Sequence, residues 1–200
     1  MLHLIFGPRA THCKELASIA DQLDAASSML GPGARASGET ALGLRGLNHQ
    51  AAGLRRKLET RLARAGAHLV DPRLTSDAAA ELCEVVRLVS RVVRCREWLR
   101  LEAVTPELAE LQAMAVGRVE VLAETARTLG SSGRWLNGPV VVQPMTAEAE
   151  ELYDRGVGAL FTGSLDPVEV LRRKAVYDVL LELVLGSDRA LEALQTASLD

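Results

Sequence analysis

Apolar residues recur every three or four positions in six separate stretches of the chain, the spacing typical of helices with one buried side. The signal is clearest where capping residues, glycine or proline bracket a stretch. Few β-branched or aromatic residues alternate with polar ones, so strands are not expected. The pattern therefore predicts an all-α fold with helices over 16–30, 44–62, 82–99, 108–126, 149–161 and 171–184.

Two of these helices have clear start signals. Thr105-Pro106 and Asp166-Pro167 each place a side-chain oxygen before a proline, which predicts an N-cap with proline at the first helical position. Glu169 completes the capping-box pattern that begins at Asp166. Because both signals directly precede an apolar-periodic stretch, they set the expected starts of the fourth and sixth helices.

Other boundaries follow from polar residues, glycine and proline. The polar stretch 75–77 is expected to open the third helix, and Gly130 is expected to end the fourth. Residues 130–145 contain three glycines and two prolines, so no continuous helix is expected there. The three consecutive valines at 140–142 are a candidate extended segment.

An Asp-Pro pair occurs at 71–72 and again at 166–167, each time between two predicted helices. This separation suggests a duplicated unit of roughly 95 residues. We therefore predict one domain over 1–200, built as a six-helix bundle from two three-helix repeats, about 10–102 and about 105–198.

Composition narrows the function classes. A chain of 200 residues with 48% hydrophobic residues can bury a sizeable core, and its net charge of −3 gives no general attraction to nucleic acid or anionic lipid. No apolar run approaches the roughly 20 residues that span a bilayer, and no signal peptide is recognisable. We expect a cytoplasmic protein that neither binds nucleic acid nor inserts into a membrane.

Candidate reactive residues are scattered. His3, His12, His49 and His68 lie in four separate contexts, and no catalytic triad, phosphate-binding glycine loop or dinucleotide fingerprint is present. The three cysteines form no CxxC pair and are expected to be reduced; Cys83 and Cys95 are expected to be partly buried thiols. We predict no enzymatic activity, no catalytic residues and no cofactor.

A basic face is the one candidate binding feature. Arg87, Arg91 and Arg94 follow one another at helical spacing in the third predicted helix and could bind an acidic partner. The alternative is a solvated face in which these arginines pair with Glu81, Glu84 and Glu97. Trp98 and Trp135 are interpreted as core or inter-helix contacts.

Four short segments of the second half carry a family resemblance: Glu150-Glu151-Leu152-Tyr153-Asp154-Arg155, Ala159-Leu160-Phe161, Asp166-Pro167 and Lys174-Ala175-Val176-Tyr177. In these segments the chain resembles PhoU-like phosphate-transport accessory proteins, short cytosolic proteins often encoded beside Pit-type phosphate transporters. Asn48-His49-Gln50-Ala51 and Asp71 extend the resemblance into the first half. It implies an all-helical fold of two three-helix units and, in the family, iron or another hard divalent ion held by acidic pairs.

This chain departs from the family at those acidic positions. The resemblance places Asn48, Ala52, Cys83, Arg87, Thr146, Glu150, Leu181 and Leu185 there, with Glu84 alongside. Glu150 is the one carboxylate among the eight, although a shifted match of the sixth helix gives Asp178 and Glu182. One carboxylate does not replace the hydration shell of a multivalent cation. We therefore predict that the metal sites are lost.

The leading hypothesis is a non-enzymatic accessory protein that docks onto a phosphate transporter or its signalling partner. One alternative is a remodelled metal site that uses Glu84, Glu150 or Cys83. Another is a homodimeric scaffold whose seam is the helix 171–184, which is apolar over most of its circumference and is expected to be buried on more than one side.

The loss of the metal sites is testable by elemental analysis of the purified, tag-free protein. We expect iron, zinc and manganese each well below one atom per chain, both as purified and after incubation with the metal and desalting, because the retained donors are too few to hold an ion. Stoichiometric metal in either sample would show that a remodelled site exists.

Overall fold

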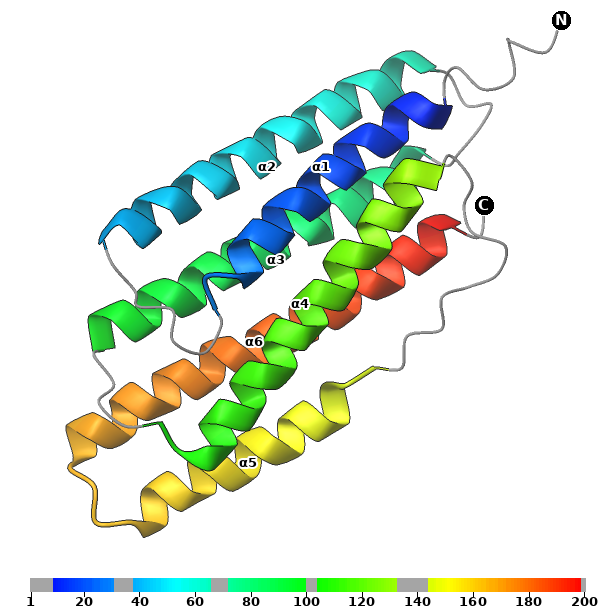
Figure 1. Cartoon of the computed structure of the whole chain (residues 1–200). Coiled ribbons are helices and arrows are strands. Elements are labelled where there is room, and N and C mark those ends of the chain that lie inside the picture. Colours follow the sequence, from blue (N-terminus) through cyan, green and yellow to red (C-terminus); the bar gives the residue numbers. More distant parts are fainter. Residues whose placement is uncertain (1–8, 31–37, 66–71, 100–103, 133–143, 199–200) are drawn as a thin grey trace, which may run out of the picture.

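The computed structural model describes residues 9–30, 38–65, 72–99, 104–132 and 144–198. Within these ranges the chain forms six helices and no strand, which confirms the predicted all-α six-helix bundle (Figure 1). None of these helices is long and apolar enough to cross a membrane. The helices are α1 (Arg9–Ser27), α2 (Gly38–Ala65), α3 (Pro72–Leu99), α4 (Pro106–Ser132), α5 (Thr146–Thr162) and α6 (Pro167–Ser198).

Four helices form the centre of the bundle and two lie at its edges. The most extensive contacts join α1 to α4 and α3 to α6, while α2 packs on α1 and α3, and α5 packs on α4 and α6. In Figure 1, α2 and α5 lie on opposite sides of the molecule. Each half of the chain thus contributes two central helices and one peripheral helix, and the predicted duplication of a three-helix unit stays a prediction.

The core is made mainly of leucine, valine and alanine from all six helices, with Ile19 and Tyr177. Apolar positions at three- and four-residue spacing fall on one side of each helix, and that side faces its neighbours. On α6 the buried residues include Val176, Val179, Leu180 and Leu183, and the helix contacts α3, α4 and α5. The prediction that this helix is buried on more than one side is therefore confirmed.

The two predicted N-caps are present. The hydroxyl oxygen of Thr105 accepts a hydrogen bond from the backbone N–H of Leu108 at 3.3 Å, and Asp166 Oδ2 accepts one from the N–H of Val168 at 3.0 Å. The capping box after Asp166 is only half formed, because the carboxylate of Glu169 instead binds the Arg173 guanidinium at 2.8 Å. The ion pair of Glu169 with Arg173, one turn later, therefore takes the place of the second half of the capping box.

Several helix boundaries differ from their predictions, most clearly in α3, α4 and α6. Helix α3 begins at Pro72, three residues before the polar stretch that was expected to open it, and Thr75 is buried. In the sequence Pro72 follows Asp71 as Pro167 follows Asp166, and both α3 and α6 begin at the proline. Helix α4 continues past Gly130 to Ser132, since one glycine costs a helix only about 1 kcal/mol, and α6 continues to Ser198. The valines at 140–142 lie outside the described residues.

Helices α5 and α6 approach closely at Gly156. A Cβ atom on this glycine would lie 2.5 Å from the Tyr177 hydroxyl oxygen. Tyr177 is fully buried, its hydroxyl is 2.6 Å from that of Thr105, and its ring meets the edge of the Tyr153 ring at a centroid distance of 6.3 Å. The Tyr177 side chain therefore has no free space into which it could move if a Cβ were added at position 156.

The Gly156 contact is testable with a matched pair of substitutions. Gly156→Ala should lower the free energy of unfolding by about 1–3 kcal/mol, because the methyl group overlaps Tyr177. Gly158→Ala on the same helix meets open space and should raise it by about 0.5–1 kcal/mol through better helix propensity. Urea denaturation followed by circular dichroism measures both, and equal effects would contradict the close approach.

Candidate partner-binding surface

The three arginines of the predicted basic face lie on the solvent side of α3, but two of them have acidic partners. Arg87 Nε donates a hydrogen bond to Glu84 Oε2 at 2.7 Å, and Arg91 forms an ion pair with Glu182 of α6. Arg94 has no carboxylate within 4 Å among the described residues. The positive charge of this face is therefore partly neutralised. The charge of Arg94 is the part that no described carboxylate compensates.

The pairing only partly follows the alternative stated from the sequence. Glu84 does bind Arg87, and this hydrogen bond lowers the pKa of the Glu84 carboxyl. Glu81 instead lies 3.8 Å from Arg189, and the partner of Arg91 comes from another helix. Sequence spacing identifies pairs within one helix and has no signal for a pair that depends on how two helices meet.

Trp98 is exposed, so its interpretation as a core or inter-helix contact was wrong. Its relative exposure is 76%. It stands seven residues after Arg91, which is two helical turns, and therefore continues the exposed side of α3 rather than the buried one. Trp135, the other tryptophan, lies outside the described residues.

The packing of α3 against α6 brings Leu171 to the same surface. The two helices run antiparallel (Figure 1). Arg91 meets Glu182, and one turn further along α3 the Cys95 thiol lies 3.8 Å from the carbonyl oxygen of Ala175. One turn further along α3, the same antiparallel register places Trp98 beside Leu171 of α6, which is 65% exposed. Leu171 precedes Glu182 by three helical turns, so it lies on the same side of α6.

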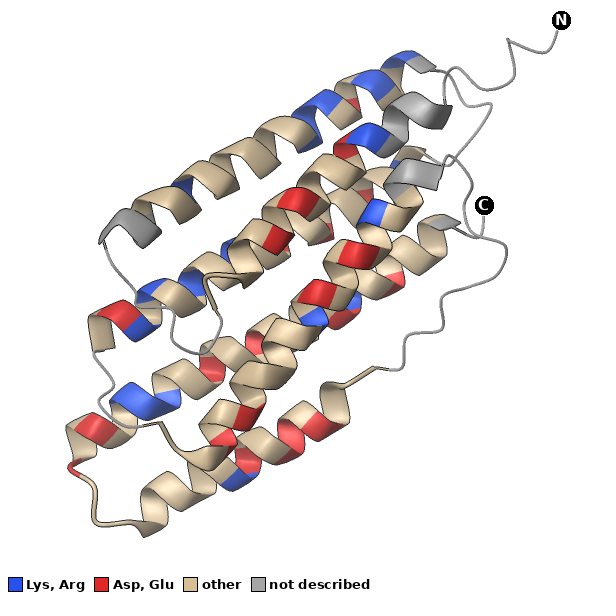
Figure 2. Ribbon diagram, viewed as in Figure 1, with Lys and Arg blue, Asp and Glu red and all other residues tan. Residues whose placement is uncertain are grey.

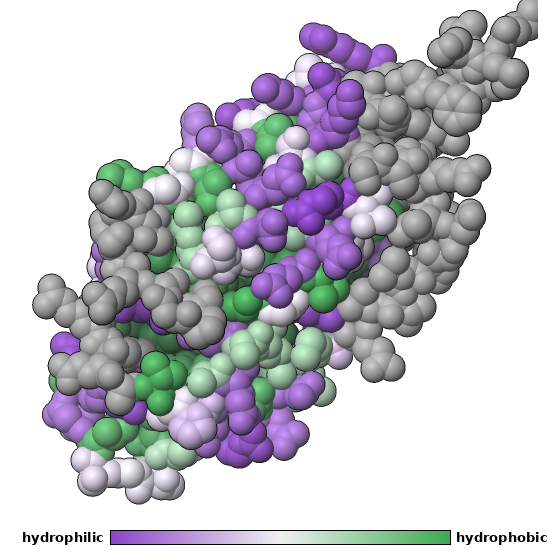
Figure 3. Space-filling view, in the orientation of Figure 1, coloured by the Kyte–Doolittle hydropathy of each residue, from purple (hydrophilic) through white to green (hydrophobic). Residues whose placement is uncertain are grey.

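We use the name α3–α6 face for the surface formed by Arg87, Arg91, Arg94, Trp98 and Leu171. Exposed apolar side chains continue beyond Leu171 around the start of α6. These are Val168, Leu165 and Phe161, and Figure 3 shows hydrophobic residues at the end of the bundle where α5 leads into α6. The arginines therefore adjoin an apolar region, a composition common in protein-binding surfaces.

Two of the positions at which the resemblance would place metal ligands, Asn48 and Cys83, make hydrogen bonds between helices. Asn48 Nδ2 donates hydrogen bonds to Ser90 Oγ at 2.6 Å and to the carbonyl oxygen of Leu44. The Cys83 thiol lies 3.5 Å from the carbonyl oxygen of Ala51. The contacts of Asn48 with Ser90 and of Cys83 with Ala51 join α2 to α3 through neutral groups.

The remaining acidic candidates are either exposed or paired with basic side chains. Glu150 is exposed on α5, and Glu84 is occupied by Arg87. Asp178 accepts hydrogen bonds from Lys174 at 2.8 Å and from the Tyr153 hydroxyl at 2.7 Å. In the part of the chain that the structure describes, no three histidine, cysteine or acidic side chains are grouped so that they could hold a metal ion.

A buried ion pair was missed in the sequence. Arg118 of α4 pairs with Asp188 of α6, and the arginine side chain is only 5% exposed. Asp188 Oδ2 also accepts hydrogen bonds at 2.9 Å from the Thr146 hydroxyl and the backbone N–H of Met145, at the start of α5. The pair lines a cavity of about 560 Å³, but because Asp188 neutralises Arg118, its role is to join three helices. Arg118 falls within the apolar stripe of α4, which is a signal that could have revealed it.

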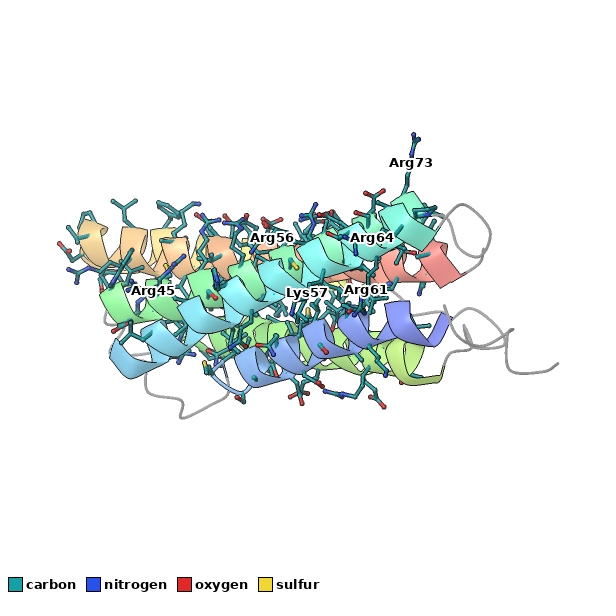
Figure 4. The ribbon with its side chains drawn as sticks, turned by 90° about the horizontal axis from the view of Figure 1, so that it is seen from above. Arg45, Arg56, Lys57, Arg61, Arg64 and Arg73 are labelled. Carbon is teal, nitrogen blue, oxygen red and sulfur yellow. The ribbon has the colours of Figure 1, made fainter. Side chains whose placement is uncertain are left out.

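A second basic region, on α2, was also missed. Its solvent side carries Arg45, Arg56, Lys57, Arg61 and Arg64, which we call the basic surface (Figure 4). The apolar periodicity of this helix predicts its buried side and gives no signal for a charged surface on its solvent side. Arg61 pairs with the buried Glu15 of α1, which fixes one end of this surface against the bundle.

The two described thiols are half-buried, as expected. Burial raises the pKa of the Cys83 thiol to about 11, and burial is also the main cause that raises the pKa of Cys95. A thiol with a raised pKa remains protonated at neutral pH and is a poor nucleophile. His49, the one histidine whose side chain the structure describes, is exposed on α2.

Comparison of the sequence with models of known protein families gives no match, and comparison with curated proteins gives none either. The functional assignment therefore rests on the surfaces described above and on the resemblance drawn from the sequence.

The protonated state of Cys83 predicts slow alkylation. At pH 8 its thiolate fraction should be about 100-fold below that of an ordinary thiol of pKa 9.0, because burial disfavours the charged form. Iodoacetamide labelling of the folded protein, mapped by mass spectrometry, should show slow modification of Cys83 that accelerates as the pH approaches 11 and in denaturant. Equal labelling rates in the folded and unfolded chain would contradict the burial of this thiol.

Proposed function

We propose that this chain is a non-enzymatic accessory protein of phosphate transport that acts by docking through its α3–α6 face. The resemblance to PhoU-like proteins supplies the biological process, and it suggests a phosphate transporter or its signalling partner as the binding partner. The geometry supports the docking itself. The partner would present an acidic segment next to an apolar one, because the α3–α6 face combines positive and apolar side chains.

The observation that carries this proposal is the exposed tryptophan beside an uncompensated arginine. Trp98 follows Arg94 by one helical turn, and both side chains lie on the outside of α3. Tryptophan and arginine are the residues most enriched among those that dominate binding energy at protein interfaces. A tryptophan left largely in water is costly in a monomer and becomes favourable when a partner covers it.

The ion pairs on the same face would prepare it for binding. Glu84 holds Arg87, and Glu182 holds Arg91, so these two side chains are ordered before a partner arrives. Less conformational entropy is then lost on association. Arg94 would supply attraction to an acidic partner, and Trp98 and Leu171 would supply apolar contact area.

Docking of this kind would regulate a transporter without chemistry. A rigid bundle that binds one conformation of the transporter more tightly than another shifts the balance toward that conformation by the difference in binding free energy. The described thiols agree with a non-catalytic role, since burial raises the pKa of both and keeps them protonated.

The proposal is tested by a pull-down of the phosphate transporter of the source cell with the double variant Arg94→Glu, Trp98→Ala. We expect affinity to fall at least about 100-fold, since residues of this type typically cost 2–4 kcal/mol each when removed from an interface centre. The matched control is Lys14→Glu on α1 with Val121→Ala on α4, which reverses one charge and truncates one apolar side chain at exposed positions outside the α3–α6 face. The control should bind as the unmodified protein does.

Undiminished binding by the Arg94→Glu, Trp98→Ala variant would remove the α3–α6 face from the proposal. If the unmodified protein captures neither the transporter nor its signalling partner, the phosphate-transport assignment fails. Circular dichroism of each variant establishes that the bundle remains folded.

A further inference from the structure

The two peripheral helices of the bundle carry opposite charges. Between positions 42 and 64, α2 has six basic and one acidic side chains, whereas α5 has four acidic and one basic. In Figure 2 the basic residues of α2 and the acidic residues of α5 lie on opposite sides of the molecule. The net charge is only −3, but positive charge is concentrated on α2 and negative charge on α5.

Most of the charge on the basic surface is uncompensated. Arg45, Arg56, Lys57 and Arg64 have no carboxylate within 4 Å in the described ranges, whereas Arg61 is paired with Glu15. In Figure 4 Arg45 lies near one end of α2, and Arg56, Lys57, Arg61 and Arg64 lie in the other half of the helix. The basic surface is therefore an extended positive strip rather than a set of internal ion pairs.

The backbone of α2 is accessible along this strip. Gly46 and Gly53 are seven residues apart on its exposed side, and a Cβ on either would meet no atom within 4 Å. A shallow groove of about 580 Å³ lies at Gly53, bordered by Arg56, Lys57 and Arg64. A helix could approach this region closely, with the basic side chains on either side of it.

Helix α5 offers a matching surface. Its acidic surface comprises Glu148, Glu150, Glu151 and Asp154, all exposed, with Glu151 at 79%. Arg155, its one basic residue, lies 4.0 Å from Glu151 and 3.6 Å from Glu110 of α4, so it leaves most of the negative charge uncompensated. Gly158 lies next to these acidic residues, and a Cβ there would also meet open space.

We propose that the basic surface on α2 of one copy docks against the acidic surface on α5 of a second copy. The charges are opposite in sign, and glycine at both surfaces permits close packing of the two helices. Other anionic partners fit less well. The described basic surface has no aromatic side chain on which a base could stack, and Leu42 is the only large exposed apolar residue on α2 available to enter a bilayer.

The position of the two helices determines the form of the assembly. Because α2 and α5 lie at opposite edges of the bundle, each copy can bind two neighbours, one through each surface. Such a head-to-tail contact builds an open chain of copies unless rotation closes it into a ring. The α3–α6 face belongs to neither peripheral helix, so an assembly would present it repeatedly, and a multivalent partner would be held more tightly.

Sedimentation velocity of the full chain tests the contact. The unmodified protein should associate in a concentration-dependent manner at low ionic strength and dissociate as salt is added, because salt screens the opposed surfaces. The variant Arg56→Glu, Lys57→Glu, Arg64→Glu and the variant Glu148→Lys, Glu151→Lys, Asp154→Lys should each lower the association constant at least about tenfold. Mixing the two variants should restore association, since each then supplies the charge that the other lacks.

Two further variants separate this contact from general electrostatic attraction. Arg87→Glu, Arg91→Glu, Arg94→Glu makes the same change in net charge as the α2 variant and should leave self-association intact. Gly53→Gln adds bulk to the groove without charge and should lower the association constant. Circular dichroism shows that every variant remains folded.

Three results would overturn the proposal. One is an unmodified protein that remains monomeric at low ionic strength and high concentration. Another is association that survives reversal of either surface or the filling of the groove. The third is a monomer whose basic surface binds anionic phospholipid vesicles or a single-stranded oligonucleotide and loses that binding in the α2 variant, which would assign the surface to a different partner.

Discussion

The antiparallel packing of α3 against α6 is the contact on which the arrangement of the surface depends. Gly186 makes close contact possible, because a Cβ there would lie 2.7 Å from Leu88 Cδ1. The register of the two helices determines which of their side chains meet on the outside. The pairing of Arg91 with Glu182 follows from this register, and so does the position of Trp98 beside Leu171.

Charge in this protein is used in three different ways. The largely buried pair of Arg118 and Asp188 holds α4, α5 and α6 together, where water screens the interaction less than at the surface. On the α3–α6 face, ion pairs hold arginine side chains in place beside an exposed tryptophan. On α2 and α5 some charges are paired, as Arg61 is with Glu15, but most have no nearby partner within the described chain and are available to another molecule. Burial and geometry, rather than the number of charged residues, distinguish these roles.

The sequence predicts the fold far better than the surface. Helical periodicity and the caps at Thr105 and Asp166 are local properties of the chain, so the six helices and two of their starts can be predicted from it. The partner of Arg91 depends on how two helices meet, which no local pattern encodes. A large apolar ring favours a core position, so the exposure of Trp98 was not predicted, although its seven-residue spacing from Arg91 indicates the exposed side of α3. Arg118 was missed although it interrupts an apolar stripe.

The buried pair of Arg118 and Asp188 also restricts how this protein can change over evolutionary time. Loss of either side chain alone would strand a desolvated charge, at a cost of about 3–5 kcal/mol, whereas joint replacement by apolar residues of similar volume can be neutral. Substitutions at these two positions should therefore be inherited together in descendants of this chain. A lineage that had exchanged both for hydrophobic residues would also have to find a new acceptor for the first turn of α5, since Asp188 now supplies it.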